Sequence, residues 1–153
     1  MSAAATEGQD KAPALLKGVA CDLDGTLLGV DQPHTIPLAN VQALKHLDDA
    51  GVRIILASGR HLSCMRQYAK RLRDGGIKDS PIISSNGALV TVGEKVVYSN
   101  PIPRGVFEAC VAFCEAKGMP LNWYLKDTIY VVSNGSAKSE GYTKRYKVGF
   151  RAA

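Results

Sequence analysis

The sequence predicts an α/β protein whose centre is a parallel β-sheet. Three short apolar segments, near residues 16–22, 52–57 and 81–85, have the composition of strands. Two segments with the apolar spacing of helices lie between them, and the connections are short. Such an alternation forms right-handed crossovers and makes the strands parallel. Functional side chains are then expected at the carboxyl ends of the strands.

The first strand is expected over residues 16–22, and it leads into the loop DGTLLGVDQPHTI. Pro37 suits the first turn of a helix that runs to about Ala50, and Gly51 is placed to end that helix. The apolar face expected for this helix consists of Leu38, Val41, Leu44 and Leu47.

The second strand, VRIILA, is apolar and β-branched enough to be covered on both faces of the sheet. The helix that follows carries an apolar stripe and is broken by the pair Gly75-Gly76. The segment PIISS, from Pro81, then supplies the third strand. The stripe of the second helix consists of Leu62, Met65, Ala69 and Leu72.

The pattern changes after Gly87. ALVTVGEKVVYSN predicts a hairpin that turns at residues 93–95, and LNWYLKDTIYVVSN predicts another that turns near Lys126 and Asp127. A helix is expected between them, with Phe107, Cys110, Val111 and Cys114 facing inward. Antiparallel hairpins after a parallel unit indicate a second, α+β subdomain that begins near residue 88.

The composition is that of one globular domain. The chain has 153 residues, of which 46% are apolar and 22% charged, which is enough for a real core. The excess positive charge is local, in residues 53–78 and 136–153, and the first of these segments reads as the solvated side of a helix without an aromatic-interleaved basic pattern, so no nucleic-acid partner is expected. No apolar run approaches the roughly 20 residues that cross a bilayer, and residues 1–17 lack the features of a signal peptide. We therefore expect a cytoplasmic protein with no membrane partner.

The cysteines and histidines show no metal-binding pattern. The four cysteines form no CxxC pair and are expected to be small buried thiols. They are Cys21, Cys64, Cys110 and Cys114. The three histidines are expected on loops or helix surfaces. They are His34, His46 and His61.

Two carboxylates, Asp22 and Asp24, follow the first strand one residue apart. Both side chains can reach one crevice from a strand-to-loop turn, and Gly25 permits a tight turn there. Carboxylates are costly to desolvate unless a positive charge lies against them. Mg²⁺ fits this demand because it takes oxygen ligands and is usually shared with a substrate phosphate. The alternative is an Asx turn that only ends the strand.

Two further motifs end the second and third strands. Ser58 and Gly59 offer a hydroxyl and an unhindered N–H near a helix start, which is a phosphate-binding arrangement, although Ser58 alone suits a helix cap equally well. Arg60 either faces a substrate or covers the start of the helix. Asn86, before Gly87, either faces a substrate or simply turns the chain.

The segments DLDGTLL, ILASGR and ISSNGALV together resemble the haloacid dehalogenase (HAD) superfamily of phosphohydrolases. The resemblance is to its Cof-type branch, which carries a large α/β cap inserted after the third strand, and it covers about residues 15–92. It implies an incomplete HAD-like Rossmannoid sheet with the start of an α+β cap. We therefore expect a disordered tail over residues 1–13, the first half of the core over 14–87 and a partial cap over 88–153.

The resemblance also implies roles for the motif residues. Asp22 would be the nucleophile that forms an aspartyl-phosphate, and Asp24 would protonate the leaving oxygen and then activate water. Mg²⁺ would be bound by the Asp22 carboxylate and the Asp24 backbone carbonyl. Ser58 would hold the phosphoryl oxygens together with backbone N–H groups of the Asp22 loop. The remaining positions expected to bind phosphate or substrate are Leu23, Gly59, Arg60, Asn86 and Gly87.

Two parts of the family's active site do not occur in this sequence: a lysine on the returning half of the core and an acidic GDxxxD-like loop. We therefore expect the N-terminal part of a Mg²⁺-dependent phosphatase that acts on a small phosphorylated metabolite, with sugar phosphates as the usual class. The alternatives are a non-catalytic phosphate-binding or regulatory module and a split enzyme whose partner chain supplies the other half of the core. A sugar phosphomutase is the related enzyme alternative, because the cap decides whether water is admitted.

Overall fold

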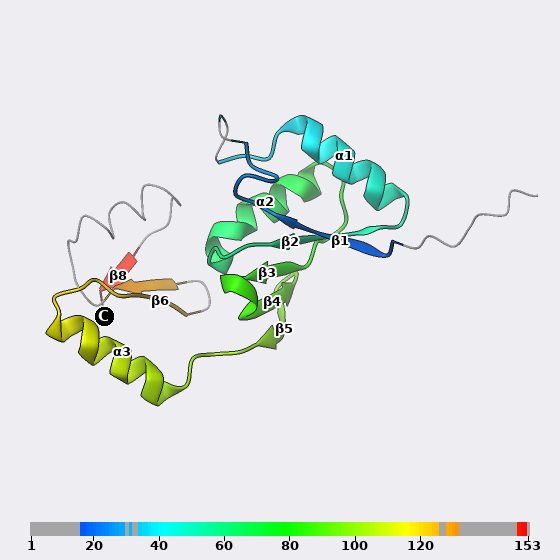
Figure 1. Ribbon diagram of the computed structural model, residues 1–153. Helices are drawn as coiled ribbons and strands as arrows, with labels where there is room; N and C mark the ends of the chain where they lie inside the picture. Colours follow the sequence, from blue (N-terminus) through cyan, green and yellow to red (C-terminus); the bar gives the residue numbers. More distant parts are fainter. Residues whose placement is uncertain (1–15, 30, 32–33, 126–127, 132–149, 153) are drawn as a thin grey trace, which may run out of the picture.

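The computed structural model describes residues 16–29, 31, 34–125, 128–131 and 150–152 (Figure 1). The tail expected over residues 1–13 and the turn expected at Lys126 and Asp127 lie outside these residues. The elements of the first part are β1 (Gly18–Asp22), α1 (Leu38–Asp49), β2 (Arg53–Ala57), α2 (Leu62–Asp74) and β3 (Ile82–Ser84). The elements that follow are a one-turn 3-10 segment (Ser85–Gly87), β4 (Leu89–Val92), β5 (Lys95–Ser99), α3 (Arg104–Ala116), β6 (Asn122–Leu125), β7 (Thr128–Val131) and β8 (Phe150–Ala152).

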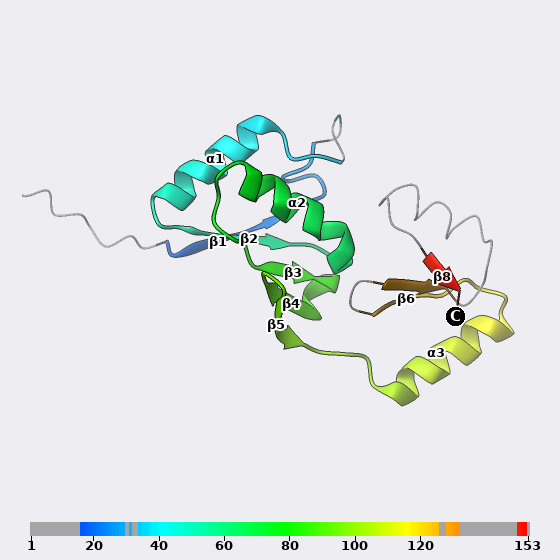
Figure 2. The same cartoon turned by 180° about the vertical axis from the view of Figure 1, so that it is seen from behind.

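A five-stranded sheet forms the centre of the fold, in the order β1-β2-β3-β4-β5. The first three strands are parallel, as expected, and β4 and β5 are antiparallel. Helices α1 and α2 both lie on one side of this sheet, which the two opposite views show (Figures 1 and 2). The core lies between them and the strands. Its strand residues include Ile54, Leu56 and Ile82, and Val19 and Cys21 pack against it.

The opposite face of the sheet is not buried by the described residues, so the expectation that VRIILA is covered on both faces is wrong. Ile55 and Ala57 of this strand are only half-buried, whereas Ile54 and Leu56 are buried. The reason is that both helices cross over to the same side. The register of the strands places one set of side chains side by side on the opposite face, and none of these is buried. They are Ala20, Ile55, Ala57, Ile83, Val90 and Tyr98.

The hairpin β4–β5 extends the core sheet, which corrects its assignment to the second subdomain from residue 88 onward. The chain reverses after β3, and β4 pairs with it through Ile83 opposite Val90 and Ser84 opposite Leu89. The separate α+β unit comprises α3 and the three-stranded sheet β6-β7-β8. By hydrogen bonding, the sheet of the core therefore extends to Ser99.

The apolar face of α1 differs from the expected one. Val41, Leu44 and Asp48 are buried, whereas Leu38 is 60% exposed. At 100° per residue, Leu38 and Leu47 lie on opposite flanks of the stripe formed by the buried three. Asp48 is tolerated there because its Oδ2 accepts a hydrogen bond from the Lys78 backbone N–H at 3.2 Å.

Both core helices end where glycine permits a left-handed residue. After α1, Gly51 has φ +85°, its N–H donates to the Asp48 carbonyl at 3.0 Å, and the Val52 N–H donates to the Leu47 carbonyl at 3.0 Å. This pair of hydrogen bonds is a Schellman motif. Gly76, with φ +84°, ends α2 in the same way. The prediction that glycine ends these helices is confirmed.

The apolar stripe of α2 is confirmed, with Leu62, Met65 and Leu72 buried and Ala69 packed against the core. In α3, Phe107, Val111 and Cys114 are half-buried, and Phe107 packs edge-on against Trp123 with ring centroids 5.2 Å apart. Cys110 is exposed, contrary to expectation, because it lies at the border of that stripe. None of the described helices is long and apolar enough to cross a bilayer.

Gly75→Ala is expected to destabilise the fold by about 1–3 kcal/mol through overpacking. The backbone of Gly75 suits any residue (φ −81°), but a Cβ there would lie 2.3 Å from Val41 Cγ1, where α2 ends beside α1. Thermal unfolding followed by circular dichroism measures the effect. Gly105→Ala in α3 is the matched control, because a Cβ there would meet no atom within 4 Å beyond its own stretch of helix. Equal unfolding midpoints for the Gly75 variant and the unmodified chain would contradict the contact.

Candidate active site

The three motifs that the sequence predicted to act together lie at one edge of the core sheet. Asp22 is the last residue of β1 and pairs with Ala57, the last residue of β2. Ala57 in turn pairs with Ile83 in β3. Because these strands are parallel, the segments that follow them leave the sheet on the same side. The carboxylates, Ser58–Arg60 and Asn86–Gly87 are therefore neighbours.

The loop after β1 is a compact turn that exposes its carboxylates. The Asp22 carbonyl accepts the Leu27 N–H at 3.2 Å, and the Leu23 carbonyl accepts the Leu28 N–H at 2.8 Å. Gly25 has φ +79°, which the turn requires. Leu23, Leu27 and Leu28 are buried in the core, whereas Asp22 and Asp24 are exposed. The apolar side chains thus anchor a loop whose acidic groups face outward.

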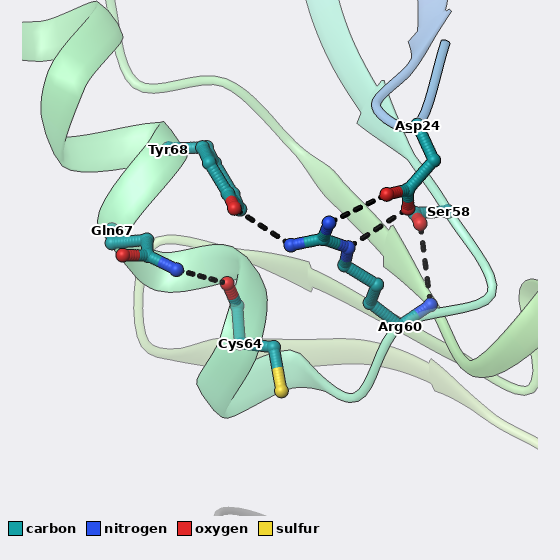
Figure 3. A network of polar contacts seen from close by, with 6 residues as sticks. All are labelled: Asp24, Ser58, Arg60, Cys64, Gln67 and Tyr68. Carbon is teal, nitrogen blue, oxygen red and sulfur yellow. Dashed lines mark hydrogen bonds and ion pairs between the residues drawn. The ribbon is translucent and has the colours of Figure 1, made fainter. Parts of the chain in front are cut away.

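Arg60 forms a bidentate ion pair with Asp24 (Figure 3). Its Nε donates to Asp24 Oδ2 at 2.8 Å and its Nη2 donates to Oδ1 at 2.6 Å. The Arg60 side chain is 5% exposed and the Asp24 side chain 47%. Burial alone would lower the pKa of Arg60, but the hydrogen bond to Asp24 and the neighbouring charges raise it above its ordinary value. The guanidinium therefore stays charged and supplies a positive charge against this carboxylate, where the sequence had led us to expect Mg²⁺.

Tyr68 of α2 holds the other side of the guanidinium. Arg60 Nη1 donates to the Tyr68 hydroxyl at 2.6 Å, and the Arg60 Cζ lies 5.3 Å from the centre of the Tyr68 ring (Figure 3). Burial raises the pKa of Tyr68, more than the nearby Arg60 lowers it, so the phenol is neutral at pH 7. Sequence analysis did not single out Tyr68. The available signal was its place on the buried stripe of α2, two turns after an arginine.

Ser58 does not cap α2. The N-cap of that helix is His61, and the Ser58 Oγ instead accepts the Arg60 backbone N–H at 3.2 Å. This contact is a local serine turn that shapes the segment between β2 and α2. The Ser58 N–H donates to the Ile83 carbonyl at 3.0 Å and ties the turn to β3. The hydroxyl is thereby held at the same edge as Asp22 and Asp24.

The segment after β3 closes against this turn. Ser85 and Asn86 have φ of 51° and 54°, which non-glycine residues rarely adopt, and Gly87 follows with φ 91°. The Ser85 N–H donates to the Arg60 carbonyl at 2.9 Å. A Cβ on residue 59 would lie 2.7 Å from Asn86 Oδ1, so Gly59 leaves the space that the Asn86 side chain uses. The structure thus brings Gly59, Asn86 and Gly87 into the candidate site.

His61, next to Arg60, is buried and not on the helix surface as expected. Its ring stacks on Tyr124 of β6, with centroids 5.1 Å apart and planes 22° from parallel. Its Nδ1 lies 2.9 Å from Ser63 Oγ. The α+β unit therefore contacts the core one residue away from the guanidinium that holds Asp24.

Among the residues that the structure describes, no group of three or more His, Cys, Asp or Glu side chains is placed to hold a metal ion. Asp22 and Asp24 nevertheless offer hard oxygen donors at one loop. Mg²⁺ is commonly held by one or two carboxylates, with waters and substrate phosphate completing its six ligands. The donor chemistry of this loop therefore fits part of a Mg²⁺ site.

Solved structures with the same architecture define the class of protein to which this fold belongs. The HAD subclass IIB sugar phosphatase BT4131 superposes with a TM-score of 0.77 at 30% identity, over 90% of this chain and 52% of that structure. A second structure, described in a study of a trigonal-bipyramidal intermediate in a phosphoryl-transfer superfamily, superposes with a TM-score of 0.77 at 28% identity. It covers 91% of this chain and 52% of the other. The class is that of HAD-like α/β proteins.

The chain belongs to the haloacid dehalogenase-like hydrolase family, whose model matches residues 19–152. MG265 of Mycoplasma genitalium is 43% identical over 97 residues, which is 61% of this chain and 32% of that protein. The 5-amino-6-(5-phospho-D-ribitylamino)uracil phosphatase YwtE of Bacillus subtilis is 27% identical over 124 residues, 80% of this chain and 41% of that protein. The resemblance to the Cof-type branch is confirmed, and the chain spans about half the length of these relatives or less.

The cysteines are expected to differ strongly in reactivity. Burial raises the pKa of the Cys64 thiol, and this side chain is 1% exposed, whereas Cys110 is exposed. Because the thiolate is the reactive form, iodoacetamide at pH 8 should modify Cys110 in the folded protein and leave Cys64 unmodified until denaturant is added. Peptide mass spectrometry over time measures both sites in one sample. Equal labelling rates without denaturant would show that the packing around Cys64 is wrong.

Proposed function

We propose that this chain carries the nucleophile-bearing half of a Mg²⁺-dependent phosphatase that acts on small phosphorylated metabolites through an aspartyl-phosphate. The observation that carries the proposal is the convergence of Asp22, Asp24 and Ser58 at one edge of a parallel sheet in a HAD-family chain. Phosphoryl transfer depends on positioning and on neutralising negative charge. This edge supplies a carboxylate nucleophile, a second carboxylate and hydrogen-bond donors within one small region.

In the proposed reaction an oxygen of the Asp22 carboxylate forms a bond to phosphorus while the bond from phosphorus to the ester oxygen breaks. Asp24, which accepts two hydrogen bonds from Arg60 in this structure, would first take up a proton from water and then give it to the departing alcohol oxygen. A water molecule then attacks phosphorus, Asp24 takes a proton from that water, and the Asp22 carboxylate is released with inorganic phosphate. The Ser58 hydroxyl and backbone N–H groups of the Asp22 loop, that of Leu23 among them, hold the phosphoryl oxygens during both steps.

Mg²⁺ would be held by the Asp22 carboxylate and the Asp24 backbone carbonyl, and when bound it would offset the charge of the phosphoryl group. Gly59, Asn86 and Gly87 lie beside Ser58 and would line the substrate side of the site. Arg60, predicted to bind substrate, has its guanidinium engaged by Asp24 and Tyr68, so its contribution to the site would come through Asp24.

We further propose sugar phosphates and related metabolites as the substrate class. BT4131 is a sugar phosphatase and YwtE acts on a phosphorylated ribityl compound. Both are longer than this chain by about a factor of two. The same first motif serves phosphomutases in the family, and the α+β unit that shields the site from water would decide between the two reactions.

The other half of the site is proposed to come from a complementary α/β unit, supplied by further chain or by a separate partner chain. The face of the sheet opposite α1 and α2 supports this, because its apolar side chains are not buried by the described residues. Such a unit would bring the lysine and acidic loop implied by the family. The four cysteines are all free thiols, which fits the proposed cytoplasmic location.

The test is Mg²⁺-dependent release of inorganic phosphate from p-nitrophenyl phosphate by the full chain. Because the proposed complementary unit is not in this assay, we expect slow release, which EDTA abolishes and added Mg²⁺ restores. Release that persists in EDTA would overturn the Mg²⁺-dependent mechanism. No release, with inorganic phosphate nevertheless binding in calorimetry, would replace the phosphatase proposal with that of a non-catalytic phosphate-binding module.

A further inference from the structure

We infer that Tyr68 is a positioning residue for the candidate acid/base, because it fixes the guanidinium of Arg60, which in turn holds the Asp24 carboxylate. This inference rests on the proposed function of Asp24 and extends the site to a side chain inside the core. The three residues form one continuous line from α2 to the loop after β1 (Figure 3).

The first link is between Arg60 and Asp24. Two parallel N–H···O contacts of 2.8 and 2.6 Å define both the direction and the rotation of the carboxylate, which one contact would not do. Asp24 sits in an exposed loop with its side chain 47% accessible. Without the guanidinium, free rotation about its side-chain bonds would spread the carboxylate over several staggered positions.

The second link fixes the arginine itself. Its long side chain is flexible in isolation, but its backbone is held at both ends: the Arg60 N–H donates to Ser58 Oγ and the Arg60 carbonyl accepts the Ser85 N–H. The far end of the guanidinium donates through Nη1 to the Tyr68 hydroxyl at 2.6 Å. Nε and Nη2 are left to face Asp24.

The third link is the rigidity of Tyr68. Its side chain is 1% exposed and belongs to the core cluster, in the middle of the thirteen-residue helix α2. A side chain packed in a core occupies one rotamer. The position of the Tyr68 hydroxyl is therefore set by the fold, and the two hydrogen-bonded steps transmit that position to the active-site loop.

Tyr68→Phe removes only the hydroxyl and keeps the ring in the core, and Tyr98→Phe in the exposed strand β5 is the matched control. The first measurement is nuclear magnetic resonance of the Arg60 guanidinium in the full chain. We expect rotation about its Nε–Cζ bond to be slow in the unmodified chain and in Tyr98→Phe, and about tenfold faster in Tyr68→Phe, because a hydrogen bond from a charged donor is lost.

The second measurement is the kinetics of Mg²⁺-dependent phosphate release. We expect Tyr68→Phe to lower kcat about tenfold and to leave KM unchanged. The reason is that the contacts to substrate are kept, whereas the Asp24 carboxyl that transfers the proton is held less firmly. Arg60→Lys keeps the positive charge but loses the two parallel N–H donors of the guanidinium, and it should lower kcat at least as much as Tyr68→Phe.

The two measurements separate the inference from the proposed function. Unchanged guanidinium rotation in Tyr68→Phe would overturn the inference whether or not the chain releases phosphate. Unchanged kcat in this variant, with Mg²⁺-dependent release intact, would also overturn it and would leave the proposed function standing. If neither the unmodified protein nor any variant releases phosphate, the proposed function fails. Faster guanidinium rotation in Tyr68→Phe alone would still support the inference that Tyr68 positions Arg60.

Discussion

Asp22→Asn is expected to lower Mg²⁺-dependent phosphate release by about a thousandfold or more. An amide oxygen carries too little charge to attack phosphorus, and removal of an enzyme's nucleophile costs more than loss of any single binding contact. Asp22 is the last residue of β1 and its side chain is exposed. The change keeps the size of the side chain, so the fold should be unaffected.

Phosphate release under saturating Mg²⁺ and thermal unfolding of the same samples test this expectation together. Asp31→Asn is the matched control, because Asp31 is also exposed and lies in the same connection between β1 and α1. Its activity should equal that of the unmodified chain. An Asp22 variant that keeps a tenth or more of the activity would exclude Asp22 as the nucleophile.

Leu56→Ala is expected to destabilise the protein by about 3–5 kcal/mol, which is a large part of the total stability of a small domain. Leu56 is fully buried in β2, on the face of the sheet that carries the core, and is a member of the core cluster. Leu56 is flanked in the sheet by Cys21 of β1 and Ile82 of β3, so the cavity left behind would lie inside the sheet's core face, which limits its collapse.

Denaturant unfolding measures this loss, and Leu38→Ala supplies the same chemical change at a position that is 60% exposed. The Leu38 variant should lie within about 0.5 kcal/mol of the unmodified chain. Similar losses of unfolding free energy at both positions would show that the buried face assigned to α1 is wrong. Leu38 would then face the core, as helical periodicity predicted.

The elements that local sequence pattern determines were predicted well. The three parallel strands and the two helices between them follow from apolar periodicity, and the helix ends follow from Gly51 and Gly76. The sheet to which β4 and β5 belong was not predictable, because a hairpin pattern encodes its own turn and not its long-range partner. The errors at Leu38 and Cys110 have another source, since both lie at the border of an apolar stripe.

The candidate site was predictable in its outline but not in its internal contacts. Parallel strands bring Asp22, Ser58 and Asn86 to one edge, so their proximity follows from the topology. The role of Ser58 in a local turn depends on the path of a few backbone atoms. Tyr68 has the sequence spacing of an ordinary core residue, and only the folded arrangement shows that its hydroxyl meets the Arg60 guanidinium.

Within the described residues only one face of the core sheet is covered, and this also affects how the protein should behave in solution. An apolar sheet face beside an edge strand favours contact with another copy of the same chain. We therefore expect sedimentation to depend on protein concentration, and the association to weaken when a complementary α/β unit is added. Kinetic and binding constants for this chain should accordingly be compared at a single stated concentration.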